Sequence, residues 1–288
     1  MNSKVRITVF MQQHGVATRP QIAAALGLSL VSTNAAVASL EKEGILFAGD
    51  LVPSGGGRPV REYHFNPQHA AVALFTATPE QHCTLLNFEL LDLHGRLKET
   101  SGARFVQLHA ESLDEWLDAA ARRHKLQRIC LPPGINKDIR MHLEQRFNCA
   151  VVEFSLAQAM SQHKEDTLTL LLQRGQPPQG ALHRHGTTTP CPLLHMLPLP
   201  AEWETLDYAD HTLVEEMLAR LLQLLTCTLA PANIVMHGDF WNARLITRLQ
   251  FNLNTKLRGI ENPPHLQFKV ISAEKLLQHQ RLAAAACQ

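Results

Sequence analysis

Beyond residue 66 the sequence passes twice through the same order of strand and helix patterns, and this repetition restricts the fold more than any other feature. Each copy has three successive strand patterns, followed by a helix, a strand, a helix, a strand and a helix. Alternating strands and helices imply parallel strands joined by right-handed crossovers. The sequence therefore predicts an α/β domain over residues 69–288, built from two copies of one unit.

The two copies can be placed along the chain from hydrophobic periodicity and turn residues. In the first copy we expect strands at 71–76, 83–93, 96–108, 128–131 and 149–153, and helices at 113–125, 138–147 and 156–163. In the second copy we expect strands at 167–173, 179–185, 193–197, 233–236 and 265–271, and helices at 211–229, 242–254 and 273–285.

Residues 1–68 have a different pattern, with short helices joined by a tight turn. The stretch from Thr18 to Gln21 matches a capping box, in which a Thr hydroxyl and a Gln amide satisfy each other's backbone donors. Gly27 supplies a turn, Ser29 can cap a further helix, and Gly44 ends it. Two short helices joined by a glycine turn predict a helix-turn-helix, whose second helix can enter the major groove of DNA.

A hairpin is expected to follow these helices. Strands at 45–47 and 62–65 flank a loop at 53–59 that contains three successive glycines. Arg58 near the tip of this loop can reach a minor groove, where A·T-rich sequence deepens the negative potential. The sequence thus predicts a winged helix-turn-helix over residues 1–68.

The residues expected to contact DNA are the exposed ones of the helix-turn-helix and the hairpin. A helix that faces a groove needs small or hydrogen-bonding side chains at its start and no acids that repel phosphates. The candidates are Arg19, Gln21, Leu30, Val31, Ser32, Asn34, Ala35, Arg58 and Arg61. Residues 1–70 carry six basic and four acidic side chains, a small positive excess. The alternative is a winged helix that serves only protein contacts.

Composition excludes several classes of protein. With 27 basic and 26 acidic residues the chain is not a general polyanion binder, and 6% aromatic residues argue against a stacking platform for single strands. The start of the chain lacks the apolar region of a signal peptide, and no uncharged apolar run approaches the ~20 residues of a membrane span. The six cysteines form no CxxC pair. We therefore expect a soluble, cytoplasmic protein with reduced thiols.

The order and spacing of several segments resemble the ROK family of repressors, open reading frames and kinases. The matching segments are 29–40, 57–59, 63–67, 92–95, 131–134 and 229–235. The resemblance implies an N-terminal winged helix-turn-helix followed by a duplicated actin-like, ribonuclease-H-like domain that serves dimerisation and effector sensing. It also implies binding of a double-stranded operator as a dimer or tetramer, and response to a sugar or sugar phosphate.

The sequence departs from the ROK kinases where their chemistry resides. The segment 75–80 replaces the family's Asp-x-Gly-Gly-Thr phosphate loop and has no glycine, while Pro79 removes a backbone donor. The family's Asn-Asp pair, whose Asp is the catalytic base, falls on Phe154-Ser155. Only His195 remains of the sugar clamp, and the cysteine-rich zinc loop is missing. Because of these departures from the family's pattern, we expect no catalytic residue, no cofactor and no metal.

The function expected from these features is a sequence-specific transcriptional regulator of ROK type that controls carbohydrate-related genes without kinase activity. Glu153, Ser155 and His195 are its candidate effector contacts. Two alternatives are a ROK sugar kinase with an appended DNA-binding domain and an architectural regulator without a ligand. A zinc site at His183, His185 and His195 is a further alternative to exposed or hydrogen-bonded histidines.

Overall fold

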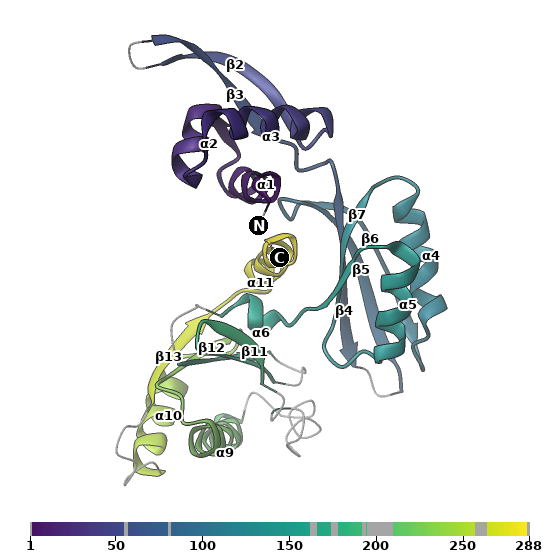
Figure 1. Ribbon diagram of the computed structural model, residues 1–288. Coiled ribbons are helices and arrows are strands. Elements are labelled where there is room, and N and C mark those ends of the chain that lie inside the picture. Colours follow the sequence, from purple (N-terminus) through teal and green to yellow (C-terminus); the bar gives the residue numbers. More distant parts are fainter. Residues whose placement is uncertain are drawn as a thin grey trace.

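The computed structural model describes residues 2–54, 57–79, 82–161, 166–173, 178–191, 194, 210–256 and 264–286. Its N-terminal unit contains three helices and a three-stranded sheet of order β1-β3-β2 (Figure 1). The elements are α1 (Ser3–His14), β1 (Val16–Thr18), α2 (Arg19–Leu26), α3 (Leu30–Lys42), β2 (Leu46–Ser54) and β3 (Gly57–Phe65). Helices α2 and α3 meet at a bend of 118°.

The remainder forms two lobes with the same sheet topology. Lobe one consists of β4 (Ala71–Pro79), β5 (Thr84–Asp92), β6 (Leu97–Phe105), α4 (Ala110–Ala121), β7 (Leu126–Leu131), α5 (Lys137–Phe147), β8 (Ala150–Glu153) and α6 (Leu156–Ala159). Lobe two consists of β9 (Thr167–Leu172), β10 (Gln179–Arg184), β11 (Thr187–Pro190), α9 (His211–Leu229), β12 (Asn233–Gly238), α10 (Ala243–Lys256), β13 (His265–Val270) and α11 (Ala273–Ala286).

Strand order confirms the predicted duplication. The sheets run β6-β5-β4-β7-β8 and β11-β10-β9-β12-β13, so that the two lobes correspond strand for strand. In each lobe the first three strands along the chain pair in antiparallel fashion, and the fourth and fifth strands join the sheet in parallel. The crossovers between those parallel strands contain the helices that cover the outer faces.

Two expected elements of the domain differ from the structure. The third strand of lobe two is Thr187–Pro190 and not 193–197, which apart from Leu194 lies outside the described residues. The chain turns back early because His185 and Gly186 both have positive φ, 54° and 69°, as a two-residue hairpin turn requires. The helix expected at 156–163 ends at Ala159, and Met160 and Ser161 are not helical.

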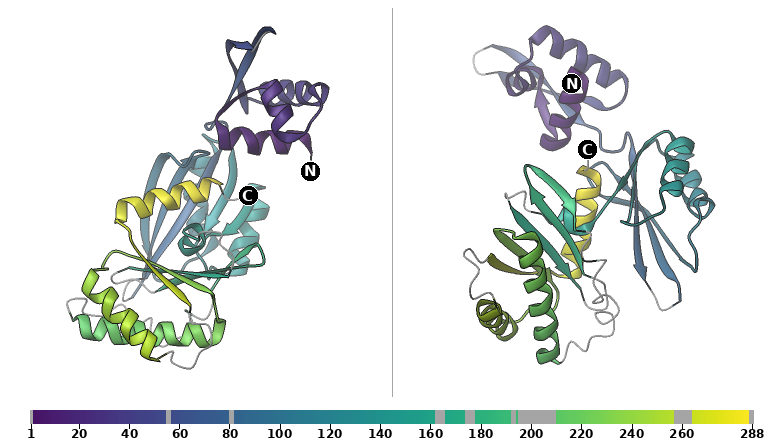
Figure 2. Two further views of the ribbon diagram at one scale, coloured as in Figure 1. Left: turned by 90° about the vertical axis from the view of Figure 1, so that its left-hand side faces the viewer. Right: turned by 60° about the horizontal axis from the view of Figure 1, so that its bottom comes forward.

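The larger buried clusters of the described residues hold these layers together. One fills lobe two between its sheet and α9 and α10, and another fills lobe one between its sheet and α4 and α5. A third joins the core of the N-terminal unit to the opposite face of the lobe-one sheet, through residues such as Phe65, Leu93 and Ala284. Figure 2 shows α11 lying across that same face of the lobe-one strands.

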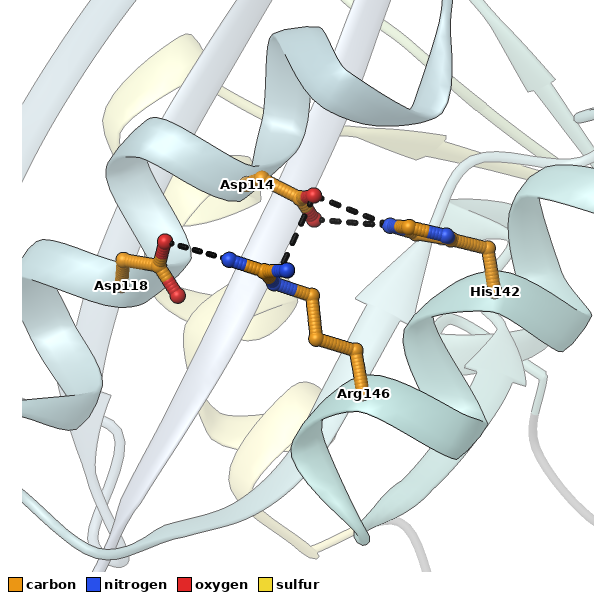
Figure 3. A network of polar contacts seen from close by, with 4 residues as sticks. All are labelled: Asp114, Asp118, His142 and Arg146. Carbon is orange, nitrogen blue, oxygen red and sulfur yellow. Dashed lines mark hydrogen bonds and ion pairs between the residues drawn. The ribbon is translucent and has the colours of Figure 1, made fainter.

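Four polar side chains connect the outer helices α4 and α5 of lobe one (Figure 3). His142 Nε2 lies 2.9 Å from Asp114 Oδ2, and Arg146 Nε lies 3.4 Å from the same oxygen. Arg146 Nη2 also donates to Asp118 at 2.8 Å, and this hydrogen bond raises the pKa of the guanidinium. The cluster ties α4 to α5 on the outside of the lobe.

Stability should fall in mild acid because of His237 on β12. Its ring is 5% exposed, its Nε2 has no partner among the described residues, and burial lowers its pKa to about 4, with Lys269 and His279 adding to the effect. The unfolded chain binds a proton near pH 6.5, so unfolding is favoured as the pH falls below that value. We expect a loss of ~2 kcal/mol between pH 7 and 5. Urea titrations of wild type and His237→Gln check this, since the variant should show a flatter pH dependence.

Candidate nucleic-acid interface

Side-chain caps fix the first residues of helices α2 and α3. Gln21 Oε1 accepts from the Thr18 backbone N–H at 2.8 Å, and the Gln21 N–H donates to Thr18 Oγ1 at 3.4 Å, which confirms the predicted capping box. Gly27 ends α2 with φ 61°, a conformation that favours glycine. The Ser32 N–H donates to Ser29 Oγ at 3.1 Å. The turn and the first residues of α3 are therefore held in one conformation.

Helix α3 has one buried and one exposed face. Thr33, Ala36, Val37 and Leu40 are buried against α1, α2 and the sheet. The opposite face, formed by Leu30, Val31, Ser32, Asn34 and Ala35, is exposed, with Val31 at 79%. This face contains no acid, since Glu41 and Glu43 come only at the far end. Lys4 Nζ pairs with Glu43 at 2.7 Å, and its hydrogen bond lowers the pKa of that carboxyl.

Two of the expected contact residues also have roles within the fold. The Arg19 guanidinium lies over the ring of Tyr63, 4.8 Å from its centroid, and the side chain is half-buried. Gln21 is exposed, but its side-chain oxygen is used in the capping box. Removing either side chain would therefore disturb the α2 region as well as any ligand contact.

The hairpin extends farther than the sequence indicates. Strands β2 and β3 continue through most of the expected loop at 53–59 and pair as far as Ser54 with Gly57. Arg58 and Arg61 are both exposed on β3. The predicted loop was thus too long, because Pro53 and Ser54 belong to β2, and Gly57 to Pro59 belong to β3.

Sequence reasoning missed an aromatic pair on the solvent face of this hairpin. Phe47, 50% exposed, stacks on His64 with 5.2 Å between ring centroids. Gly49 permits the arrangement, because a Cβ there would lie 2.4 Å from His64 Nε2. Strand β1 was also missed, because its three residues between two helices are too few to show the alternating pattern of a strand. For the aromatic pair, the sequence offered one indication, because the exposed Phe47 alternates with its buried neighbour Leu46.

Residues 75–79, part of the segment where the resemblance places a phosphate loop, are regular strand. Residues Phe75 to Pro79 pair in register with Phe88 to Thr84 as part of an antiparallel hairpin. Phe75 is 1% exposed and packs against Phe88 and Trp116, with centroids at 5.2 and 6.1 Å. An apolar side chain and a strand ladder thus stand where the resemblance expects a glycine loop.

The structure describes two of the three candidate effector residues. Glu153 is exposed at the end of β8. Ser155 is 3% exposed, and its backbone N–H donates to Gln158 Oε1 at 3.2 Å at the start of α6. His195 lies outside the described residues.

His183 and His185 do not share a strand face, and His195, the third histidine considered for zinc, lies outside the described residues. His183 is buried on β10, and its Nδ1 lies 2.8 Å from Thr188 Oγ1, whereas His185 is exposed in the following turn. In the described ranges no group of three metal-ligating side chains is present. In the same ranges no single helix is long and apolar enough to cross a membrane, although α2 and α3 together pass that test as a bent pair.

Comparison with known proteins gives a match only at the level of structure. No protein-family model and no curated protein matches the chain. A solved ROK family transcriptional regulator, described as a homolog of the E. coli MLC protein, is 11% identical and has a TM-score of 0.61. The similarity covers 99% of this chain and 95% of that chain, and so includes the N-terminal unit.

Sugar kinases of the ROK family are also among the structural neighbours. A ROK hexokinase from Thermus thermophilus is 16% identical over 73% of this chain and 98% of its own, with a TM-score of 0.43. A ROK glucokinase from Streptomyces griseus, in complex with glucose and AMPPNP, is 13% identical over 74% and 98%, with a TM-score of 0.45. The similarity to the solved ROK regulator shows that the chain has the α/β fold of a ROK protein.

Proposed function

We propose that the chain is a DNA-binding transcriptional regulator of ROK type, in which residues 1–68 form a winged helix-turn-helix. The observation that carries this proposal is the exposed, acid-free face at the start of α3, opposite a buried stripe that fixes the helix. The 118° bend between α2 and α3 lies within the ~90–120° of helix-turn-helix motifs. The similarity to a ROK transcriptional regulator along almost the whole chain supports the same reading.

The chemistry of this face suits the major groove. Asn34 can make a bidentate contact to adenine, and Ser32 can bond a base edge or a phosphate. Leu30, Val31 and Ala35 can contact thymine methyl groups. On β3, Arg58 and Arg61 offer two exposed cations for phosphates or a narrow minor groove.

Sugar kinase activity is the weaker candidate. Its phosphate loop would occupy the segment in which Phe75 is buried and the backbone is paired in a strand. Its catalytic carboxylate would occupy the position of Ser155, a hydroxyl that is buried.

The proposed role of the two lobes is therefore dimerisation or tetramerisation and sensing of a sugar or similar small molecule. Thermal-shift titration with sugars and sugar phosphates tests the sensing role, and an unchanged midpoint throughout would contradict it.

Separate substitutions in the helix and the hairpin should separate specific from general binding. Asn34→Ala should weaken binding to the preferred duplex by ~10-fold, since a bidentate base contact is worth ~1–3 kcal/mol, and should leave scrambled DNA unaffected. Arg58→Ala should weaken both duplexes and reduce the salt slope by about one phosphate contact. Fluorescence anisotropy across a salt series measures both, with circular dichroism as the folding control. Wild-type behaviour in both variants would favour the protein-contact alternative.

The protein should not phosphorylate sugars. We expect no ATP-dependent phosphorylation of hexoses or N-acetyl amino sugars, and Ser155→Asp alone should not create it, because strand β4 still lacks a phosphate cradle. A coupled assay of ADP release with purified wild type and variant measures this. Sugar-dependent turnover by the wild type would overturn the regulator-only proposal.

A further inference from the structure

The C-terminal helix α11 contacts all three units of the molecule. It begins in lobe two, where Leu276 is buried in a cluster with Met160, Leu171 and Ile271. Its 14 residues extend ~21 Å, and its last turns lie beside lobe one and α1 (Figures 1 and 2). A single helix therefore runs from the core of lobe two to the N-terminal unit.

The second half of α11 is held tightly on lobe one. Arg281 donates to both carboxylate oxygens of Glu89, at 2.9 and 2.6 Å, and this pairing raises the pKa of the guanidinium. Gly95, with φ 76°, lies so close that a Cβ would be 2.9 Å from the backbone C and O of Arg281. Arg128 Nη1 donates to Ala284 O at 3.5 Å. These contacts leave α11 little freedom to slide across the sheet.

One side chain connects the end of α11 to the N-terminal unit. Gln12 Nε2, on α1, donates to Ala285 O at 3.2 Å and to Leu93 O at 3.1 Å. The single amide thus bridges α1, α11 and the β5–β6 turn. Ala284 is buried in the same cluster as Ile7 and Met11 of α1.

Packing around this bridge is incomplete. A cleft of about 440 Å³ opens beside Gln12, with Gln13, His14, His94 and Leu282 among the lining residues. Close-packed cores resist displacement, whereas a contact beside a cleft can shift without the loss of a packed surface. The polar bridge of Gln12 therefore acts together with the buried contact around Ala284 to hold α1 on α11.

We propose that α11 transmits rearrangements of lobe two to the N-terminal unit through Gln12, so that this bridge sets the position of α1. Gln12 is a positioning residue and does not contact DNA. The regulatory meaning of the link rests on the proposed DNA-binding function. The link itself concerns only contacts within the chain and can be tested without DNA.

Hydrogen–deuterium exchange of the full chain tests the bridge with a matched pair. Gln12→Ala should accelerate exchange about fivefold in both α1 and the last turns of α11, since it removes two hydrogen bonds. Gln13→Ala, the same change on the neighbouring residue, should stay within about twofold of wild type. Equal exchange in the two variants would overturn the proposal.

A second pair tests transmission from lobe two. Leu276→Ala weakens the lobe-two end of α11, and we expect faster exchange in α1 although Leu276 belongs to a different buried cluster. Leu253→Ala removes an equally buried side chain from the α10 side of lobe two and should leave α1 unchanged. Unchanged α1 exchange in Leu276→Ala, with faster exchange in residues 273–280, would overturn the proposal. If Leu276→Ala unfolds the whole chain, Ile271→Val, a smaller truncation in the same lobe-two cluster, replaces it and should also accelerate exchange in α1.

Discussion

Ala35→Glu should weaken binding to the preferred duplex by at least ~100-fold without unfolding the protein. Ala35 is exposed on α3, so the larger side chain meets no packed neighbour. On the proposed major-groove face it would place a carboxylate against the phosphates and base edges, where like charges cost several kcal/mol. The change also leaves the helix propensity of the position almost unaltered.

The control for this variant is Met141→Glu on α5. It adds the same charge at an exposed helical position, 45% accessible, on the outside of lobe one. Anisotropy titrations of both variants at one salt concentration, with circular dichroism spectra, compare the two sites. Equal effects in both would mean that only net charge matters, and equal affinity to wild type in Ala35→Glu would remove α3 from the interface.

Phe75→Ala should destabilise lobe one by ~3–5 kcal/mol, as expected for a fully buried aromatic side chain. Phe75 packs against both Phe88 and Trp116, so the truncation leaves a cavity beneath α4 and removes two ring contacts. Phe251→Ala, the same change at a side chain 70% exposed on α10, should cost less than ~1 kcal/mol.

Hydrogen exchange of β4, β5 and β7 in increasing urea measures the stability of lobe one, because a chain with several units need not unfold in one step. A small effect of Phe75→Ala would show that strand β4 is not held by its aromatic cluster. It would also support the alternative that residues 75–79 rearrange to bind phosphate.

Local patterns predicted the features that depend on near neighbours. The amphipathic stripe of α3 follows from Thr33, Val37 and Leu40, all of which are buried, and the cap at Ser29 follows from one side chain and the next turn. The duplication was predictable for a similar reason, since strand and helix periods repeat in order even where sequence identity between the copies is low. Helix α9 begins and ends at the expected residues.

Features that depend on backbone geometry or on distant partners were not predictable. The turn at His185 and Gly186 requires two positive φ values, and histidine gives little local indication of this conformation. The Gln12 bridge joins residues 81 and 273 positions away, so no window of sequence contains it. The Arg19 contact with Tyr63 likewise appears only once α2 packs on β3. The candidate contact face was therefore predictable, and its connection to the lobes was not.

Selection of bound duplexes from a random pool tests most directly whether residues 1–68 read DNA sequence. We expect wild-type protein to enrich a two-fold symmetric site with half-sites about one helical turn apart, as a dimer of helix-turn-helix units requires. Ala35→Glu should enrich nothing, and Met141→Glu should enrich the same site as wild type. A wild-type pool that remains random after repeated rounds, from folded protein at low salt, would contradict the proposed function.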